Sequence, residues 1–252
     1  MGRAGTYKII VLSLIVLVLN CCKKSQLDDC FSSAGDPAER LIPLENFTRL
    51  QIGQKFDVVL VQDTSEEPKL IVRAGENLLA GIETENVDGL LTIRNTNTCN
   101  FVRSFKKRIY LEVHVKDLSE LIISGDVHVS NKDTLKLKSL RITESGLNDL
   151  ILTVDVAERV FVYTLNSCGV ILKGRAEKLE GSIEEVTNLD ARDLVCDEVL
   201  INIHTPWDCY IDGREIIFVK IYNSGNIYYR QEPITQKELN VQKGTGELLL
   251  LE

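Results

Sequence analysis

Short apolar runs return about every twenty residues through the second half of this 252-residue chain. Six of them begin at positions separated by 19, 20, 19, 20 and 18 residues: Leu121, Leu140, Val160, Leu179, Val199 and Ile217. Between them lies a second series of runs, which begin at Val127, Leu150, Val170 and Ile227. A fixed period of this length is typical of a solenoid, in which each repeat buries its apolar side chains against its neighbours.

The period predicts an all-β fold, namely a parallel β-solenoid whose coils stack ~4.8 Å apart. Asparagines fit its corners, because Asn tolerates left-handed backbone and bonds to neighbouring coils; those near equivalent positions are Asn148, Asn166, Asn188 and Asn223. An antiparallel sandwich also repeats its strands every ~8–12 residues. The solenoid is favoured because the period holds over six coils and because Asn-Gly and Asp-Gly hairpin turns are scarce.

The first half of the chain predicts a strand and hairpin region. Apolar or alternating runs occur at 56–61, 69–73, 90–94 and 109–115, bounded by turn residues. Asp88-Gly89 predicts a hairpin between residues 82–87 and 90–95. Residues 74–82 allow one or two helical turns.

The N-terminus has the features of an export signal. Arg3 and Lys8 precede eleven apolar residues at 9–19, a stretch too short to span a membrane. Cysteine follows at once, which resembles the lipobox of bacterial lipoproteins, where the cysteine is acylated and becomes the mature N-terminus. Cys22 is the preferred position, with Leu19 three residues before it, and Cys21 is the alternative. An ordinary cleaved signal is the competing interpretation.

These features divide the chain into three parts: a signal peptide over 1–21, a lipidated tether over 22–40 and a single solenoid domain over 41–252. Residues 23–40 are polar and contain Gly35 and Pro37. Removal of the signal takes two basic residues and no acidic one, so the net charge changes from −8 to −10. Anionic membrane would repel such a surface, so the lipid must provide the attachment.

Several runs of the mature chain resemble the head GIN domain family of putative auto-transporter adhesins, found in lipoproteins of Gram-negative bacteria. The runs are FTRLQI at 47–52, FDVVLVQD at 56–63, VRAGENL at 72–78, VDGLLTI at 87–93, NTCNFVRSFKK at 97–107, DCYI at 208–211 and SGNIYY at 224–229. The resemblance extends from about residue 41 to the C-terminus. It implies a right-handed parallel β-helix-like fold and no established activity. The Pro206-Trp207 step and the missing glycine near Asn188 depart from uniform coils.

Composition excludes several classes of function. The acidic balance argues against nucleic-acid binding. Three histidines, one methionine and no Cys-x-x-Cys spacing leave little material for a metal site, and no cofactor motif is present. His114, His128 and His204 each alternate with aliphatic residues and are expected to face outward or to be paired.

The seven cysteines allow one candidate disulfide. Cys30 and Cys99 both lie among polar residues, and a bond between them would pin the tether to the domain, worth ~4 kcal/mol. Two free thiols are the alternative. Cys168 and Cys209 lie about two coils apart, too far for a bond. Together with Cys196 they are expected in the core.

Two charged clusters are candidates for chemistry. Parallel β-helix enzymes that cleave polysaccharides use carboxylates clustered on one face; the candidate group is Asp190, Arg192 and Asp193 with Asp212, Arg214 and Glu215 one coil later. A charge-paired, solvated turn is the plainer interpretation. The cationic patch formed by Arg103, Lys106, Lys107 and Arg108 beside Phe101 and Phe105 could receive an anionic ligand, or form an exposed loop. The apolar strand near residues 246–252 either caps the solenoid or offers an edge to a partner.

These features predict a lipid-anchored outer-membrane protein of a Gram-negative bacterium, facing the periplasm or the cell surface. Its expected role is non-catalytic binding of a surface glycan or protein. The alternatives are a β-helix carbohydrate-active enzyme and a periplasmic scaffold or sensor.

Overall fold

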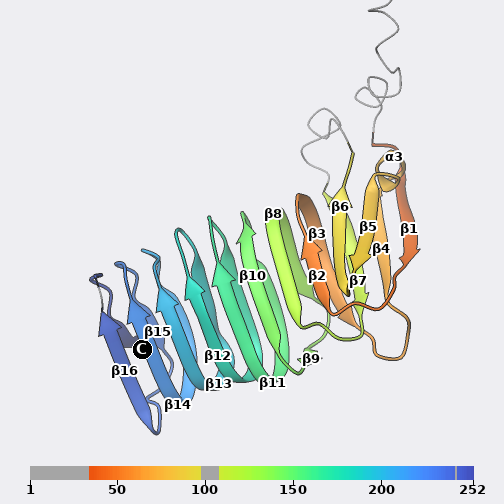
Figure 1. The fold of residues 1–252 in the computed structure, drawn as a ribbon. Coiled ribbons are helices and arrows are strands. Elements are labelled where there is room, and N and C mark those ends of the chain that lie inside the picture. Colours follow the sequence, from red (N-terminus) through yellow and green to blue (C-terminus); the bar gives the residue numbers. More distant parts are fainter. Residues whose placement is uncertain (1–33, 98–107, 242) are drawn as a thin grey trace, which may run out of the picture.

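The computed structural model describes residues 34–97, 108–241 and 243–252, and it is almost entirely β (Figure 1). A single four-residue helix, α3, is the only helix among them. The elements in chain order are β1 (Pro37–Pro43), β2 (Arg49–Ile52), β3 (Lys55–Gln62), β4 (Lys69–Gly75), α3 (Glu76–Leu79), β5 (Ile82–Val87), β6 (Leu90–Asn95), β7 (Ile109–Val115), β8 (Glu120–Asn131), β9 (Leu135–Leu137), β10 (Leu140–Gly146), β11 (Leu150–Thr164), β12 (Gly169–Ile183), β13 (Asn188–Ile203), β14 (Cys209–Ile221), β15 (Ile227–Tyr229), β16 (Gln236–Val241) and β17 (Leu248–Leu250).

Two ladders of mainly parallel strands run the length of the molecule. The first ladder joins β5, β6, β2, β8, β10, β11, β12, β13, β14 and β16. The second joins β1, β4, β7, β3, β8, β11, β12, β13, β14, β15 and β17. The long strands contribute to both ladders, since each forms two sides of one coil. This confirms the predicted β-solenoid.

The core is an aliphatic column enclosed by the coils. Along the strands buried residues alternate with partly exposed ones, as in β7, because successive side chains point to opposite faces. Val160, Leu179, Val199 and Ile217 stack in consecutive coils and are fully buried. Full burial of such a side chain contributes roughly 1.5–3 kcal/mol, so the stacked positions provide most of the driving force for folding.

The predicted register is confirmed over four of its five steps. Leu140 pairs with Val160, and the alignment continues through Leu179, Val199 and Ile217. The first step was wrong by two residues, because Leu121 pairs with Ile142 and not with Leu140. A shift of two leaves the same face of the strand inward, so apolar alternation alone does not distinguish the two alignments.

Among the described strands, antiparallel pairing is confined to the N-terminal end of the rod. The predicted hairpin is present as β5 and β6, which Asp88 and Gly89 join with positive φ angles of 51° and 76°. The helix lies inside the predicted range. Strand β1 pairs antiparallel with β4 and begins at Pro37, so residues 37–40 of the expected tether are part of the sheet.

Corner residues connect neighbouring coils. Asn166 adopts the left-handed backbone (φ 65°) and donates a hydrogen bond from its side chain to the Ser145 carbonyl, 2.7 Å away. Asn223 donates to the His204 carbonyl at 3.1 Å. Asn188 is different: it is the first residue of β13 and pairs with Gly169. The asparagines therefore act at several corners and do not form one continuous ladder.

Candidate functional site

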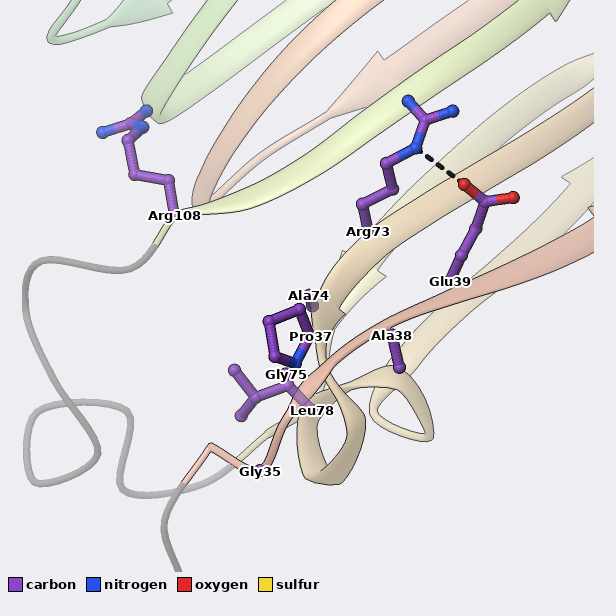
Figure 2. Close-up of a pocket in the computed structure, with 9 residues that line it drawn as sticks. All are labelled: Gly35, Pro37, Ala38, Glu39, Arg73, Ala74, Gly75, Leu78 and Arg108. Carbon is purple, nitrogen blue, oxygen red and sulfur yellow. Dashed lines mark hydrogen bonds and ion pairs between the residues drawn. The ribbon is translucent and has the colours of Figure 1, made fainter.

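A cavity of about 510 Å³ lies at the N-terminal end of the rod, beside β1, β4 and α3. Small and apolar residues form most of its wall: Gly35, Pro37, Ala38, Ala74, Gly75 and Leu78 (Figure 2). Strand β1 can lie this close to β4 because Gly75 has no side chain. A Cβ at Gly75 would lie 2.1 Å from the Ala34 carbonyl oxygen. Glycine at this position thus shapes the cavity.

Three charged side chains complete the wall, and Arg73 stands between two acids. Its Nε donates to Glu39 across the β1–β4 pair at 2.7 Å (Figure 2). A terminal nitrogen donates to Glu112 of β7 at 3.0 Å. Its guanidinium also lies over the Tyr110 ring, 5.3 Å from the ring centroid. These bonds to Glu39 and Glu112 raise the pKa of Arg73, so its charge is permanent and already balanced.

Arg108 is the one member of the predicted cationic patch among the described residues, and its guanidinium has four acceptors. Nε donates to Asp57 at 2.5 Å and Nη1 to Asp126 at 2.6 Å. Nη2 donates to the carbonyls of Phe56 and Asp126, each at 2.8 Å. Burial disfavours ionised Asp126, but bonds from Arg108 and Asn148 outweigh it and lower the pKa of that carboxyl. Arg108 therefore joins β3, β7 and β8.

The wall composition determines what the cavity can accept. Both arginines are neutralised by carboxylates, so neither offers an unpaired positive charge to an anion. The remaining surface is apolar and small-chained. Such a cavity favours an apolar ligand over a phosphate or an acidic sugar.

Three of the four carboxylates considered for polysaccharide cleavage are each held by an arginine. Asp190 binds Arg192 at 2.8 Å, and Asp212 binds Arg214 at 3.2 Å. Asp193 binds Arg230, the residue that follows β15, at 3.0 Å. Glu215 is exposed. The expectation of one solvent-facing cluster was wrong for Asp212, which is buried and pairs in register with Val195.

The aromatic side chains nearby continue this pairing. The Arg192 guanidinium lies 3.7 Å from the centroid of Tyr210, which stacks on Tyr228 at 5.3 Å. Asp190, Tyr210 and Tyr228 occupy one register position in successive coils. The result is a short ladder of stacked groups over β13, β14 and β15, in which Arg192 contacts both Asp190 and Tyr210.

The histidines are paired or exposed, as expected. His114 bonds Glu112 at 2.8 Å, His128 is exposed, and His204 stacks on Tyr222 with ring centroids 4.1 Å apart. The three cysteines Cys168, Cys196 and Cys209 are buried free thiols, and burial raises the pKa of each to about 12. These thiols are core residues without nucleophilic character.

Glu144 was not foreseen from the sequence, although it continues the inward alternation of Leu140 and Ile142. Its side chain is fully buried, and Oε1 accepts a hydrogen bond from the Gly146 amide at 2.8 Å. Oε2 has no partner. Burial raises the pKa of the carboxyl to about 7. The cavity was also missed, since the residues of β1 that form it were assigned to the tether.

Several predicted sites lie outside the described residues: Cys21, Cys22, Cys30, Cys99, Arg103, Lys106 and Lys107. Within the described parts of the chain, no three His, Cys, Asp or Glu side chains are grouped closely enough to hold a metal ion. Among those same residues, no helix has the length and apolar character needed to cross a membrane.

The chain belongs to the head GIN domain family, described as "Putative auto-transporter adhesin, head GIN domain", whose model matches residues 46–233. Membership makes it a protein of the adhesin-like, cell-envelope or surface class. No curated protein matches the chain.

Solved structures have the same fold. A putative adhesin from Bacteroides fragilis is 20% identical, with a TM-score of 0.79, over 86% of this chain and 97% of that one. A putative adhesin from Parabacteroides merdae is 16% identical, with a TM-score of 0.64, over 87% and 98%. A putative lipid binding protein from Parabacteroides distasonis is also 16% identical at 0.64, over 86% and 98%.

Proposed function

We propose that this chain is a lipid-anchored envelope protein of a Gram-negative bacterium whose solenoid binds a surface ligand without catalysis. Membership of the head GIN family carries the proposal, because the family is described as putative adhesins. The solenoid suits such a role, since stacked coils present outward side chains at a fixed spacing on a stiff surface.

The state of the carboxylates supports binding over hydrolysis. Glycoside hydrolysis needs one acid with a raised pKa that reaches the substrate. Glu144 is a carboxyl group with a raised pKa, but it is enclosed in the core. Asp190 and Asp193 of the candidate cluster form ion pairs with arginines.

The position of the N-terminal end supports a tethered rod. Ala34 lies next to Gly75, at the end of the stack that holds β1 and α3 (Figure 1). An acyl group on Cys22 would leave eleven residues, 23–33, between the lipid and this end. A fully extended tether of that length spans at most ~40 Å, so this end of the rod would lie within that distance of the lipid.

Two measurements test the anchor and the location. Mass spectrometry of the mature protein is expected to find an acylated N-terminal Cys22, or Cys21; an unmodified Ser or Lys terminus would contradict it. Protease treatment of intact cells is expected to degrade the solenoid. Complete protection on intact cells, with digestion after lysis, would favour the periplasmic scaffold instead.

The apolar cavity supports a second candidate function, the binding of an apolar chain. A neighbour of the same fold is described as a putative lipid binding protein, and the cavity wall of this chain suits an acyl chain. A fluorescent fatty acid is expected to bind the native chain and to be excluded by Ala38→Trp, which fills the cavity. Equal binding by Leu147→Trp and Ala38→Trp would place the fatty acid elsewhere, since Leu147 is exposed on the side of the rod.

A further inference from the structure

The C-terminal end of the rod finishes on two strands that each have one neighbour among the described residues. β16 pairs with β14, and β17 pairs with β15. Their other edges carry backbone groups able to pair with a further strand. Figure 1 shows both at the end opposite to β1 and α3.

Side chains that belong to the core are exposed at this end. Leu239 and Val241 align with Val219 and Ile221 of the preceding coil, which are fully buried. Yet Leu239 is 40% exposed and Val241 is 43% exposed. Leu250, aligned with the buried Tyr229, is 49% exposed. The column of inward side chains thus ends uncovered.

The opposite end is better protected against strand addition. Leu41 and Val87 are exposed there, but β1 begins and ends with proline, and β5 carries Glu83 and Glu85. Proline and charge are the usual devices that prevent edge pairing. At the C-terminal end, Lys237 is neutralised by Glu232 at 2.6 Å, and β17 consists of three leucines.

Two of the three segments outside the described residues, 1–33 and 98–107, attach far from this surface; the third is residue 242, which directly follows β16. Ala34, Asn97 and Arg108 all lie at the β1 and α3 end: Ala34 beside Gly75, Asn97 bonded to Leu78, and Arg108 in the cavity wall. Eight ladder steps of ~4.8 Å separate β6 from β16, roughly 38 Å. Residues 98–107 must leave and return to the same end, so they reach only about half that distance.

Charge selects a symmetric pairing of two copies. If two β16 strands pair antiparallel about Leu239, then Leu239 meets Leu239, Glu238 meets Asn240 and Lys237 meets Val241. Pairing about Glu238 would instead oppose two glutamates, which is destabilising. If the two copies are related by a two-fold axis normal to this sheet, their inward side chains remain on the same face of the combined sheet. The apolar columns of the two copies then meet at the joint. Residues 227–252 carry three basic and four acidic residues, whereas the whole chain has a net charge of −8. Electrostatic repulsion between two copies is therefore weaker at this end than over the chain as a whole.

We propose that the open C-terminal end, formed by Leu239, Val241 and Leu250 on β16 and β17, is an interaction surface for a second copy of this chain, joined tail to tail through antiparallel β16 strands. The interface is isologous, because the same surface serves both copies. The proposal is independent of the ligand.

Sedimentation of the full chain in a mild detergent tests the association. The mass of the native chain is expected to rise with concentration from one copy to two. The variant Leu239→Asp/Val241→Asp is expected to remain one copy, while the control Leu147→Asp/Ile151→Asp, with the same charge change on exposed side residues, still pairs. A native chain that stays single at every concentration, or two variants that behave alike, would overturn the proposal.

Cross-linking tests the orientation even if the aspartate variant loses its last coil. A photoreactive residue replaces Gln236, and heavy-isotope and ordinary copies are mixed so that links between copies are recognised. Links are expected within residues 227–252 of the other copy. Links to β1 or β5 of the other copy would mean a head-to-tail contact and would refute the tail-to-tail arrangement, as would the absence of any link between copies.

Discussion

At the scale of single residues, a column of buried polar groups lies along one corner of the solenoid. Thr164 and Thr187 bond through their hydroxyls at 2.6 Å, and Thr205 donates to the Thr187 carbonyl at 2.7 Å. Glu144 lies in the coil before Thr164 and aligns with it. One carboxylate oxygen of Glu144 has no hydrogen-bond partner. The threonines satisfy their polar atoms locally, whereas Glu144 is costly when ionised.

Glu144→Gln is expected to change how stability depends on pH. The pKa of Glu144 in the folded state is about 7, above the usual 4.5. The contribution of this group to the free energy of unfolding is therefore fully present below pH 4.5 and is lost as the pH rises through 7. The stability of the variant relative to native is therefore expected to increase by about 3 kcal/mol between about pH 5 and 9. Urea unfolding at both pH values measures it.

Glu177→Gln is the control, because the Glu177 side chain is exposed. It is expected to show no such pH-dependent difference from the native chain. A difference between Glu144→Gln and native that is the same at both pH values would mean that Glu144 titrates as an ordinary carboxyl.

At the scale of strands, close backbone approach between coils depends on glycine at one inward position of β12. Gly181 pairs with Val162, and a Cβ there would lie 2.1 Å from the Val162 carbonyl oxygen. Gly181 therefore occupies an inward position at which the neighbouring coils carry Val162 and Ile201. In the sequence it appears only as an interruption of the apolar run that begins at Leu179.

Gly181→Ala is expected to destabilise the protein by about 1–3 kcal/mol, because the methyl group forces two coils apart. Thermal unfolding followed by circular dichroism measures the loss. Ser182→Ala, on the outward face of the same strand, is expected to have a much smaller effect. Equal melting temperatures for the two variants would show that β12 is not packed against β11 in this register.

Alternation and period were sufficient to predict the coils, but the elements that build the cavity were not predictable in the same way. Leu140, Val160, Leu179, Val199 and Ile217 align as their spacing indicated. Strand β1 has no such pattern: its residues are mostly exposed, and pairing with β4 holds it. Arg108 looked like part of a basic patch because its partners, Asp57 and Asp126, are distant in sequence.

At the scale of the whole molecule, the rod has two unlike ends. The N-terminal end holds the apolar cavity and the start of the tether, and the C-terminal end exposes the inward column. A lipid at one end and a second copy at the other would leave the sides of the rod for ligands. There the Arg192, Tyr210 and Tyr228 ladder provides a regular polar and aromatic surface.

Cell attachment tests the central claim, that this envelope-anchored solenoid acts by binding. Cells lacking the chain are expected to attach less to glycan- and protein-coated surfaces than the parent cells. The native chain should restore attachment, and the anchor-deficient variant Cys21→Ser/Cys22→Ser, expressed at the same level, should not. Undiminished attachment of the cells that lack the chain, on every surface on which the parent cells attach, would contradict the account.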